Sequence, residues 1–237
     1  MPDEQMNILR FIDIGQVDYR ESLDLQESIR SAVEQGSQES QVIFVEHPAV
    51  LTFGKHGKSE NLLTTPAKLA EQSIQIFETD RGGQITAHEP GQLVMYPILS
   101  ITHFKLTPKN YVCALEKSVI KLLADIGIAS ETDKEHPGIW VGNDKICAIG
   151  VRIKGRVTMH GIALNVDNLM TTFAHIVPCG IKNRGVTSIK ACRTDYPAMG
   201  KIKQKLSENF AEFLGCQELR VDVSHRLQSN EMTPMID

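Results

Sequence analysis

Apolar residues recur at three- and four-residue spacing in three parts of the chain, and each recurrence predicts an amphipathic helix. Turn and breaker residues bound the segments: a glycine ends each of the first two, and a proline opens the second. The predicted helices are the segment carrying Leu25, Ile29 and Val33 and ending at Gly36, the segment from Pro108 to Gly127, and the segment from about 197 to 214.

The remaining apolar residues fall in short β-rich runs, some of them alternating with polar residues, as expected of strands. These runs are residues 9–14, 41–45, 74–77, 93–98, 139–141, 145–153 and 158–166. The spacers Gly142-Asn143-Asp144 and Lys154-Gly155-Arg156 have the composition of hairpin turns. Hairpins combined with a few long helices predict an α+β fold with a mixed β-sheet and flanking helices, and residues 1–237 are expected to form a single domain.

Length and composition are those of a soluble globular protein. The chain has 237 residues, of which 41% are hydrophobic and 23% charged. No apolar run reaches the roughly 18 residues of a membrane span, and Asp3 and Glu4 stand where a secretory signal would be basic and then apolar. We therefore expect a cytoplasmic protein that has no contact with a membrane.

Five cysteines are scattered along the chain, and no two form a CxxC pair. An odd, unpaired set argues against a disulfide framework and against a zinc knuckle, so free thiols and no metal site are expected.

Charge is unevenly distributed along the sequence. Residues 145–205 contain eleven Lys and Arg against two acids, a net charge of +9, whereas the whole chain has a net charge of -4. A basic lobe of this kind is compatible with an anionic docking partner or with a chance cluster of solvated cations. Arg152, Lys154 and Arg184 are the candidate docking residues.

A glycine-rich stretch, residues 81–92, is the first candidate for chemistry. Paired glycines allow the backbone to approach a ligand closely, while Arg81, Thr86 and His88 supply a cation, a hydroxyl and an imidazole. An ordinary hairpin explains the glycines equally well. The stretch is neither a Walker loop nor a GxGxxG turn, so it does not predict a nucleotide site.

Two predicted strands form the second and third candidates. A strand that begins with Lys145 could present a partly desolvated amine to a pocket, although the pattern alone favours a solvent-facing lysine at a hairpin end. Small residues at Gly161 and Ala163 could leave space for a ligand, or could mark a bulge or close packing.

Cys179 is the fourth candidate, because it lies on a turn between a proline and a glycine rather than on an apolar face. A cysteine nucleophile needs a nearby cation or base to ionise at neutral pH. Lys145, His160 and His88 are the candidates for that role.

Taken in order, the four stretches resemble the LipB-type lipoyl(octanoyl) transferases, whose pattern runs RGGxxTxHGPGQ, KxxAIGV, HGxALN and PCGI. The resemblance covers roughly residues 5–215 and includes Glu46-His47-Pro48, residues 138–142 and residues 185–188, whereas the tail after Leu214 matches no motif. It implies the catalytic fold of lipoate and biotin protein ligases.

Carried over by position, the resemblance implies that Cys179 is the nucleophile and that Lys145 lowers its pKa. It also implies an acyl site formed by Arg81, Gly82, Gly83, Gln84, Ile85, Thr86, Ala87, His88, Ala148, Ile149, Gly150, Gly161, Ile162 and Ala163. Two positions depart from the family pattern: Glu89 replaces a glycine, and Ala87 stands where an aromatic residue is common. We expect Glu89 to pair with Arg81 or Lys145 or to face outward, because an unpaired buried carboxylate is costly.

The implied reaction is transfer of octanoyl from octanoyl-acyl carrier protein, through a Cys179 thioester, to a specific lysine of a lipoyl domain. It is the first step of endogenous protein lipoylation, and the acceptors are lipoyl domains of 2-oxoacid dehydrogenase complexes and the glycine cleavage H protein. Neither ATP, nor a metal, nor another cofactor is needed, because the thioester is already activated, and no nucleic acid is involved.

Three alternatives remain open on the sequence. An ATP-dependent lipoate-protein ligase of the same fold would have no use for Cys179. A cysteine hydrolase of acyl thioesters would pair Cys179 with His160 or His88 and use water as the acceptor. A carrier-protein binding module would have only an incidental thiol.

Overall fold

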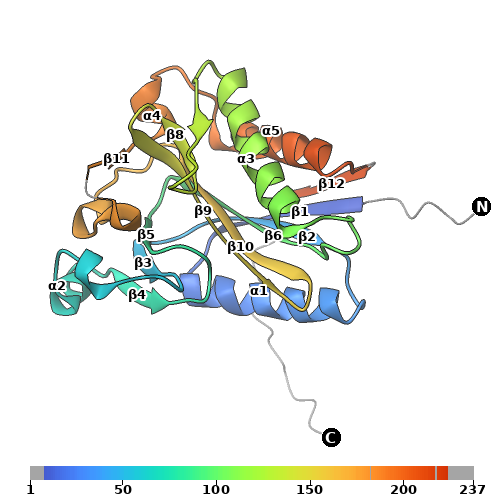
Figure 1. Cartoon of the computed structure of the whole chain (residues 1–237), viewed down its shortest axis with the longest axis horizontal. Helices are drawn as coiled ribbons and strands as arrows, with labels where there is room; N and C mark the ends of the chain where they lie inside the picture. Colours follow the sequence, from blue (N-terminus) through green and yellow to red (C-terminus); the bar gives the residue numbers. More distant parts are fainter. Residues whose placement is uncertain (1–7, 182, 217, 224–237) are drawn as a thin grey trace, which may run out of the picture.

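The large sheet dominates the computed structural model, in which residues 8–181, 183–216 and 218–223 are described (Figure 1). Its strand order is β12-β1-β2-β6-β10-β9-β8-β7, and β11 pairs with β9 away from this path. The strands are β1 (Ile8–Gln16), β2 (Gln41–Glu46), β6 (Gln92–Ile98), β7 (Glu131–Thr132), β8 (Ile139–Val141), β9 (Asp144–Lys154), β10 (Val157–Asn165), β11 (Gly185–Val186) and β12 (Glu218–Val223).

The sheet is mixed because it contains both parallel and antiparallel strand pairs. Strand β1 pairs in parallel with both β12 and β2, whereas the ladders from β2 through β6, β10, β9 and β8 to β7 are antiparallel. Both predicted hairpins, β8–β9 and β9–β10, are present. In the second, Gly155 and Arg156 have φ values of +57° and +63°, as a two-residue turn of the type I′ kind requires.

A small second sheet has the order β4-β3-β5. It consists of β3 (Val50–Phe53), β4 (Gln75–Glu78) and β5 (Ile85–His88). The hydrophobic pattern predicted only β4. Four-residue strands give too little periodicity to identify, and β5 lies inside the glycine-rich stretch.

The helices are α1 (Tyr19–Glu34), α2 (Pro66–Glu71), α3 (Pro108–Asp125), α4 (Ile189–Cys192) and α5 (Met199–Phe213), with 3-10 turns η1 (Ser59–Asn61), η2 (Thr172–His175) and η3 (Pro178–Gly180). Three of the helices, α1, α3 and α5, correspond to the predicted segments, whereas α2 and α4 are short and were not predicted. Helix α3 begins with Pro108 in its first turn, and the Thr107 hydroxyl accepts a hydrogen bond from the Asn110 N–H at 3.1 Å. No helix in the described part of the chain is long and apolar enough to cross a membrane.

Helices cover both faces of the large sheet (Figure 1). Helices α3 and α5 pack on one face over a core that includes Phe11, Met95 and Leu115, and α1 covers the other face through Ile29 and Val33. A third cluster lies at the small sheet and α2, with residues such as Leu51, Leu69 and Phe173. The predicted α+β class with a mixed sheet is thereby confirmed. Its consequence for function is that β9 and β10 lie at the centre of the molecule, within reach of the glycine-rich loop.

Candidate active site

One cavity of about 570 Å³ collects most of the residues that the sequence singled out. Strands β9 and β10, strand β5 and the loop of residues 81–84 contribute most of its wall, and the lining surface is mainly apolar. Such a volume suits a small organic ligand. All residues predicted for an acyl site line this cavity except Ala87: the lining members are Arg81, Gly82, Gly83, Gln84, Ile85, Thr86, His88, Ala148, Ile149, Gly150, Gly161, Ile162 and Ala163.

Ala87 and Gly161 differ from what the sequence suggested. Ala87 is buried in the cluster of the small sheet rather than at the cavity wall. Gly161 does line the cavity, but a Cβ placed on it would lie 2.1 Å from the Met95 carbonyl oxygen. The missing side chain at Gly161 therefore allows β6 to approach closely and does not make room for a ligand, so the close-packing interpretation holds there.

Arg81 shapes the glycine-rich loop from inside. Its buried guanidinium donates to the carbonyl oxygens of Thr52 at 2.6 Å, Gln84 at 2.8 Å and Gly82 at 3.0 Å. The Gly82 N–H in turn donates to the Val151 carbonyl oxygen of β9 at 2.9 Å. These bonds hold the loop between the small sheet and β9, so Arg81 is part of the scaffold of the cavity as well as of its wall.

Lys145 begins the β9 wall and is buried, with 5% of its surface exposed. Its Nζ donates to the Pro137 carbonyl oxygen at 2.9 Å and lies 4.8 Å from the centre of the Trp140 ring. The solvent-facing position that the pattern alone favoured is therefore wrong. The side chain is held at the cavity wall because the loop before β8 folds over it.

The turn that carries Cys179 borders the same cavity. The Cys179 side chain lies outside the described part of the structure, but its neighbours are placed: Ile181 lines the cavity, and η3 packs against β5. On one side of the turn, the Gln84 amide oxygen accepts a hydrogen bond from Asn61 at 2.8 Å and lies where a Cβ on Gly180 would point.

After the turn, β11 pairs with the start of β9, and the Thr187 N–H donates to the Lys145 carbonyl oxygen at 3.0 Å. The backbone therefore returns to Lys145 shortly after Cys179.

The other cysteines offer no comparable setting among the described side chains. Burial raises the pKa of the Cys147 thiol to about 12 and that of the Cys216 thiol to about 11. Cys113 is half-buried on α3 and Cys192 is exposed. Cys147 and Cys216 fit the expectation of inert packing thiols.

Five aromatic and imidazole side chains form a buried group that we call the imidazole cluster: Tyr19, His47, His88, Tyr96 and His160. Burial lowers the pKa of His88 to about 3 and those of His47 and His160 to about 4, so all three are neutral at pH 7. A neutral His47 donates from Nδ1 to the Val17 carbonyl oxygen at 2.7 Å and accepts the Tyr96 hydroxyl at Nε2.

The two histidines considered as partners of Cys179 have other hydrogen bonds. His88 Nδ1 lies 2.7 Å from the Gln92 amide oxygen, and His160 Nε2 lies 3.4 Å from an Asp80 oxygen. With pKa values this low, neither imidazole is suited to hold a proton near neutral pH. Lys145 is the candidate that combines burial, cavity lining and connection to the Cys179 turn.

Glu89 is buried and paired, but not with the residues expected for it. Its carboxylate accepts hydrogen bonds from the Thr172 N–H at 2.9 Å, the Asn168 amide at 3.1 Å, the Thr171 hydroxyl at 3.3 Å and the Met170 N–H. The expectation of pairing with Arg81 or Lys145, or of an outward-facing side chain, is therefore wrong. Glu89 satisfies the loop that leads into η2 and the Cys179 turn, so its charge is compensated by N–H and O–H donors rather than by a cation.

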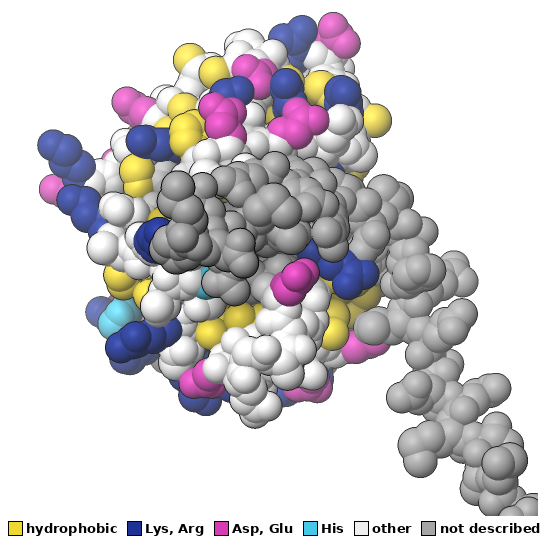
Figure 2. Space-filling view, turned by 90° about the vertical axis from the view of Figure 1, so that its right-hand side faces the viewer, with side chains coloured by type: hydrophobic (Ala, Val, Ile, Leu, Met, Phe, Trp, Pro, Cys, Tyr) yellow, Lys and Arg dark blue, Asp and Glu magenta, His cyan; other side chains and the backbone are white. Residues whose placement is uncertain are grey.

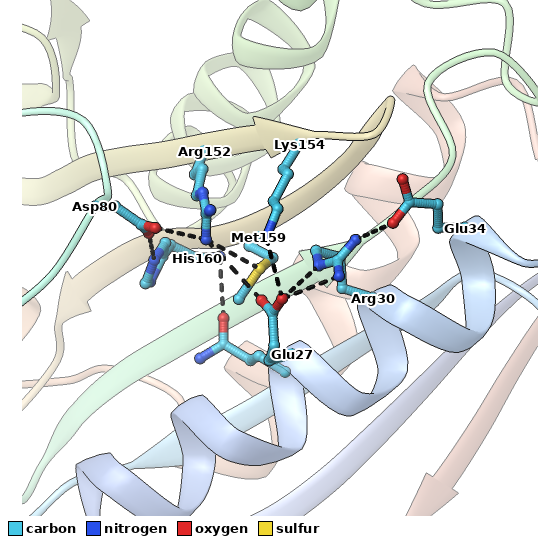
Figure 3. A network of polar contacts seen from close by, with 9 residues as sticks. Glu27, Arg30, Glu34, Asp80, Arg152, Lys154, Met159 and His160 are labelled. Atoms are coloured by element: carbon cyan, nitrogen blue, oxygen red, sulfur yellow. Dashed lines mark hydrogen bonds and ion pairs between the residues drawn. The ribbon is translucent and has the colours of Figure 1, made fainter.

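The basic stretch of the sequence does not form an unpaired basic lobe. Arg152 lies 2.6 Å from Asp80 and 3.9 Å from Glu27, and Lys154 lies 3.7 Å from Glu27 (Figure 3). Arg184 pairs with Asp133. Acids from other parts of the chain thus compensate cations of residues 145–205. Figure 2 likewise shows basic and acidic side chains interspersed on the face it displays.

Trp140 and Asn61 are site residues that sequence reasoning did not identify. Trp140 contacts Lys145, and Asn61 holds Gln84 beside the Cys179 turn. Trp140 was visible as the single tryptophan of the chain, beside Gly138, whereas nothing in the sequence marked Asn61. Among the residues that the structure describes, no group of His, Cys, Asp and Glu could hold a metal ion.

A family model described as the lipoyl protein ligase A/B catalytic domain matches residues 18–211. An octanoyltransferase of Alkaliphilus metalliredigens is 42% identical over 183 residues, which cover 77% of this chain and 84% of the relative. Further curated relatives, 36–42% identical, carry the same name.

Solved structures show the same fold at low sequence identity. Lipoate-protein ligase A bound with ATP superimposes with a TM-score of 0.75 at 17% identity, covering 93% of this chain and 90% of the ligase. A bi-partite lipoate protein ligase, solved in a study with its E2 lipoyl domain from Thermoplasma acidophilum, has a TM-score of 0.63 at 14% identity and covers 93% and 87% of the two chains.

Proposed function

The chain belongs to the lipoyl protein ligase A/B catalytic domain family and is an acyltransferase of the octanoyltransferase kind, and on that premise we propose its donor, intermediate and acceptor. It takes octanoyl from octanoyl-acyl carrier protein, carries it as a thioester on Cys179, and passes it to a specific lysine of a lipoyl domain. The observation that supports this most is a buried Lys145 on the wall of an apolar cavity that the Cys179 turn borders.

In the first half-reaction, the Cys179 thiolate attacks the carbonyl carbon of the carrier-bound octanoyl thioester. The bond from that carbon to the carrier's sulfur breaks, and the carrier leaves as a thiolate that takes up a proton from the Lys145 ammonium, which becomes a neutral amine. One thioester replaces another, so the step needs no external energy source. The ammonium form of Lys145 favours the Cys179 thiolate by charge attraction.

In the second half-reaction, the lysine amine of the lipoyl domain attacks the Cys179 thioester. An amide forms, the bond to Cys179 breaks and restores the thiolate, and the attacking nitrogen loses a proton that a neutral Lys145 amine can accept. Amide formation from a thioester is downhill, which drives the overall transfer.

Carrier proteins and lipoyl domains are the partners this chemistry requires, used in turn because one cavity must serve both. Two-oxoacid dehydrogenase lipoyl domains and the glycine cleavage H protein are the proposed acceptors, in the cytoplasm, at the first step of protein lipoylation. Arg152, Lys154 and Arg184 are already paired with acids. Their case as docking residues for an acidic partner is therefore weaker than the sequence suggested.

A lipoate-protein ligase is the second candidate function, since a ligase bound with ATP shares the fold. A ligase activates a free acid and has no covalent enzyme intermediate, which separates the two functions experimentally. Incubation with octanoyl-acyl carrier protein in ATP-free buffer should give an octanoyl-enzyme by intact mass. Apo lipoyl domain should then remove that mass and acquire it. Transfer that needs free octanoate and ATP would favour the ligase, and release of free octanoate to water would favour a hydrolase.

A further inference from the structure

The ring of Trp140, on β8, is in contact with two cationic side chains. The guanidinium carbon of Arg184 lies 3.4 Å from the ring centre, at van der Waals contact, and Lys145 Nζ lies 4.8 Å from it. The indole is 1% exposed, and its N–H donates to the His136 carbonyl oxygen at 3.0 Å. An ordinary core tryptophan has its faces covered by aliphatic groups, so two cations on one ring call for an explanation.

Arg184 is fixed by an ion pair as well as by the ring. Its guanidinium pairs with Asp133, whose other carboxylate oxygen accepts the Glu135 and His136 N–H groups at 2.8 and 2.9 Å. The hydrogen bond from Arg184, with those two backbone bonds, lowers the pKa of Asp133 to about 2. The guanidinium is thus charge-compensated and acts on Trp140 as a flat stacking surface rather than as an unpaired charge beside Lys145.

Lys145 is confined on several sides by the same loop. Pro137 supplies the carbonyl oxygen that its Nζ contacts, and Trp140 supplies the ring. A Cβ on Gly138 would lie 3.0 Å from the lysine Cε, and the φ of Gly138 is +137°, which disfavours any side chain there. The loop before β8 is therefore shaped around the lysine stem.

A ring face and a carbonyl oxygen both interact better with an ammonium than with a neutral amine. Both also restrict a side chain that otherwise samples many rotamers. An interaction at this position therefore sets where the lysine nitrogen lies.

We infer that Trp140, held by the Arg184–Asp133 pair, is the positioning residue for Lys145 in the transfer reaction: it fixes the lysine nitrogen at the cavity wall, near the Cys179 turn. The inference rests on the proposed roles of Lys145 and Cys179. Trp140 acts through Lys145 and does not itself contact the reacting carbonyl.

The test compares Trp140→Leu, Trp140→Phe and Arg184→Lys with the wild type. Iodoacetamide alkylation of Cys179 is followed from pH 5 to 10 by peptide mass, and single-turnover octanoylation is followed by intact mass. Trp140→Leu should slow alkylation at pH 7 about tenfold and displace the pH profile of Cys179 upward, because the lysine nitrogen is no longer held near the Cys179 turn. Trp140→Phe and Arg184→Lys, which keep a smaller ring or only the charge, should each slow it about threefold.

The matched control is Phe213→Leu, which removes the remote contact of Lys117 with an aromatic ring at 5.9 Å and should leave the alkylation profile in place. Melting temperatures of all variants are compared. A Trp140→Leu variant that melts lower but keeps the wild-type pH profile would overturn the inference and leave Trp140 a core residue. If Trp140→Leu does not fold, unchanged profiles in Trp140→Phe and Arg184→Lys would do the same.

The wild type separates this inference from the proposed function. If it forms no octanoyl-enzyme, the function fails, while the alkylation profiles still test whether Trp140 acts on Lys145 and Cys179. If the octanoyl-enzyme forms and the profiles do not move, the inference alone fails.

Discussion

The two ends of the central cavity contrast in charge and in exposure. Lys145 and the Cys179 turn lie at the start of β9, beside a loop that includes exposed residues such as Glu135. His160 lies across from Val151, six residues further along β9, or about 20 Å away at the usual rise of a strand. It belongs to the buried imidazole cluster, and the Arg152–Asp80 ion pair lies at its edge. We call the first the charged end, which we propose exchanges protons during transfer, and the second the neutral end, because burial keeps its imidazoles neutral at pH 7. The difference teaches that histidines in a pocket are not by themselves catalytic bases.

The largest effect is expected where the charged end is broken. Cys179→Ser should abolish the octanoyl-enzyme, because an alcohol stays protonated where the thiol ionises. Lys145→Ala should retain some adduct but displace the alkylation profile of Cys179 to higher pH. Cys147→Ser, at a buried thiol whose pKa is raised to about 12, is the matched control and should transfer octanoyl normally. Alkylation of Cys147 or Cys192 ahead of Cys179 at neutral pH contradicts the assignment.

Glu89 directly follows β5 and binds residues 168–172, so its removal should loosen the chain that leads to the Cys179 turn. Glu89→Ala leaves the donors of residues 168–172 without an acceptor and should cost about 3 kcal/mol of unfolding free energy. Glu89→Gln keeps one acceptor oxygen and should cost about half as much. Exposed Glu78 provides the control, Glu78→Ala. Urea unfolding measures all three. A cost below about 0.5 kcal/mol for Glu89→Ala would show that the contacts are not maintained in solution.

The neutral end should make the protein acid-labile. The folded-state pKa values of His47, His88 and His160 lie below the ordinary 6.5, so the unfolded chain takes up protons first as the pH falls. Their contribution to stability is therefore complete above about pH 6.5 and is lost as the pH falls toward 4. At pH 5 each histidine should cost about 2 kcal/mol relative to pH 8.

Urea unfolding at pH 8 and pH 5 measures this acid effect. His88→Gln should reduce the difference between the two pH values, whereas His103→Gln, at an exposed histidine, should not. Equal stability of the wild type at both pH values would mean that the three histidines bind protons equally well in the folded and unfolded chain, and would contradict a neutral end.

A smaller effect is expected for chain length. Burial of each methylene of the acyl chain contributes about 0.8 kcal/mol of binding free energy. Hexanoyl, which has two fewer, should therefore be transferred on the order of tenfold less efficiently than octanoyl. Ala163→Val adds bulk at the cavity wall and should reduce the preference for octanoyl over hexanoyl. Gly161→Ala should destabilise the protein instead, because its Cβ would meet the β6 backbone. Equal rates for hexanoyl and octanoyl carriers would argue against this cavity as the acyl site.

The sequence predicted the helices and long strands well because their apolar periodicity is local. Pro108 and Gly127, for example, bound α3 closely. It missed β3, β5, β7, β11 and β12, which are short or lie outside any motif. From the order of the motifs, Lys145 and the glycine-rich loop could be assigned to one site. Side-chain partners could not be predicted, because those of Glu89 and Arg152 come from segments dozens of residues away. Trp140 could not be placed on Lys145 because a register shift between β8 and β9 sets that contact.

The central claim is that the charged end of the cavity carries the acyl group on Cys179. Peptide mapping of the protein after exposure to octanoyl-acyl carrier protein without ATP tests it most directly. The account predicts octanoyl on the peptide that contains Cys179, strongly reduced in Lys145→Ala, and lost on addition of apo lipoyl domain, whose lysine gains it. Octanoyl on another residue, or acceptor octanoylation with no enzyme adduct at any time, would contradict the account.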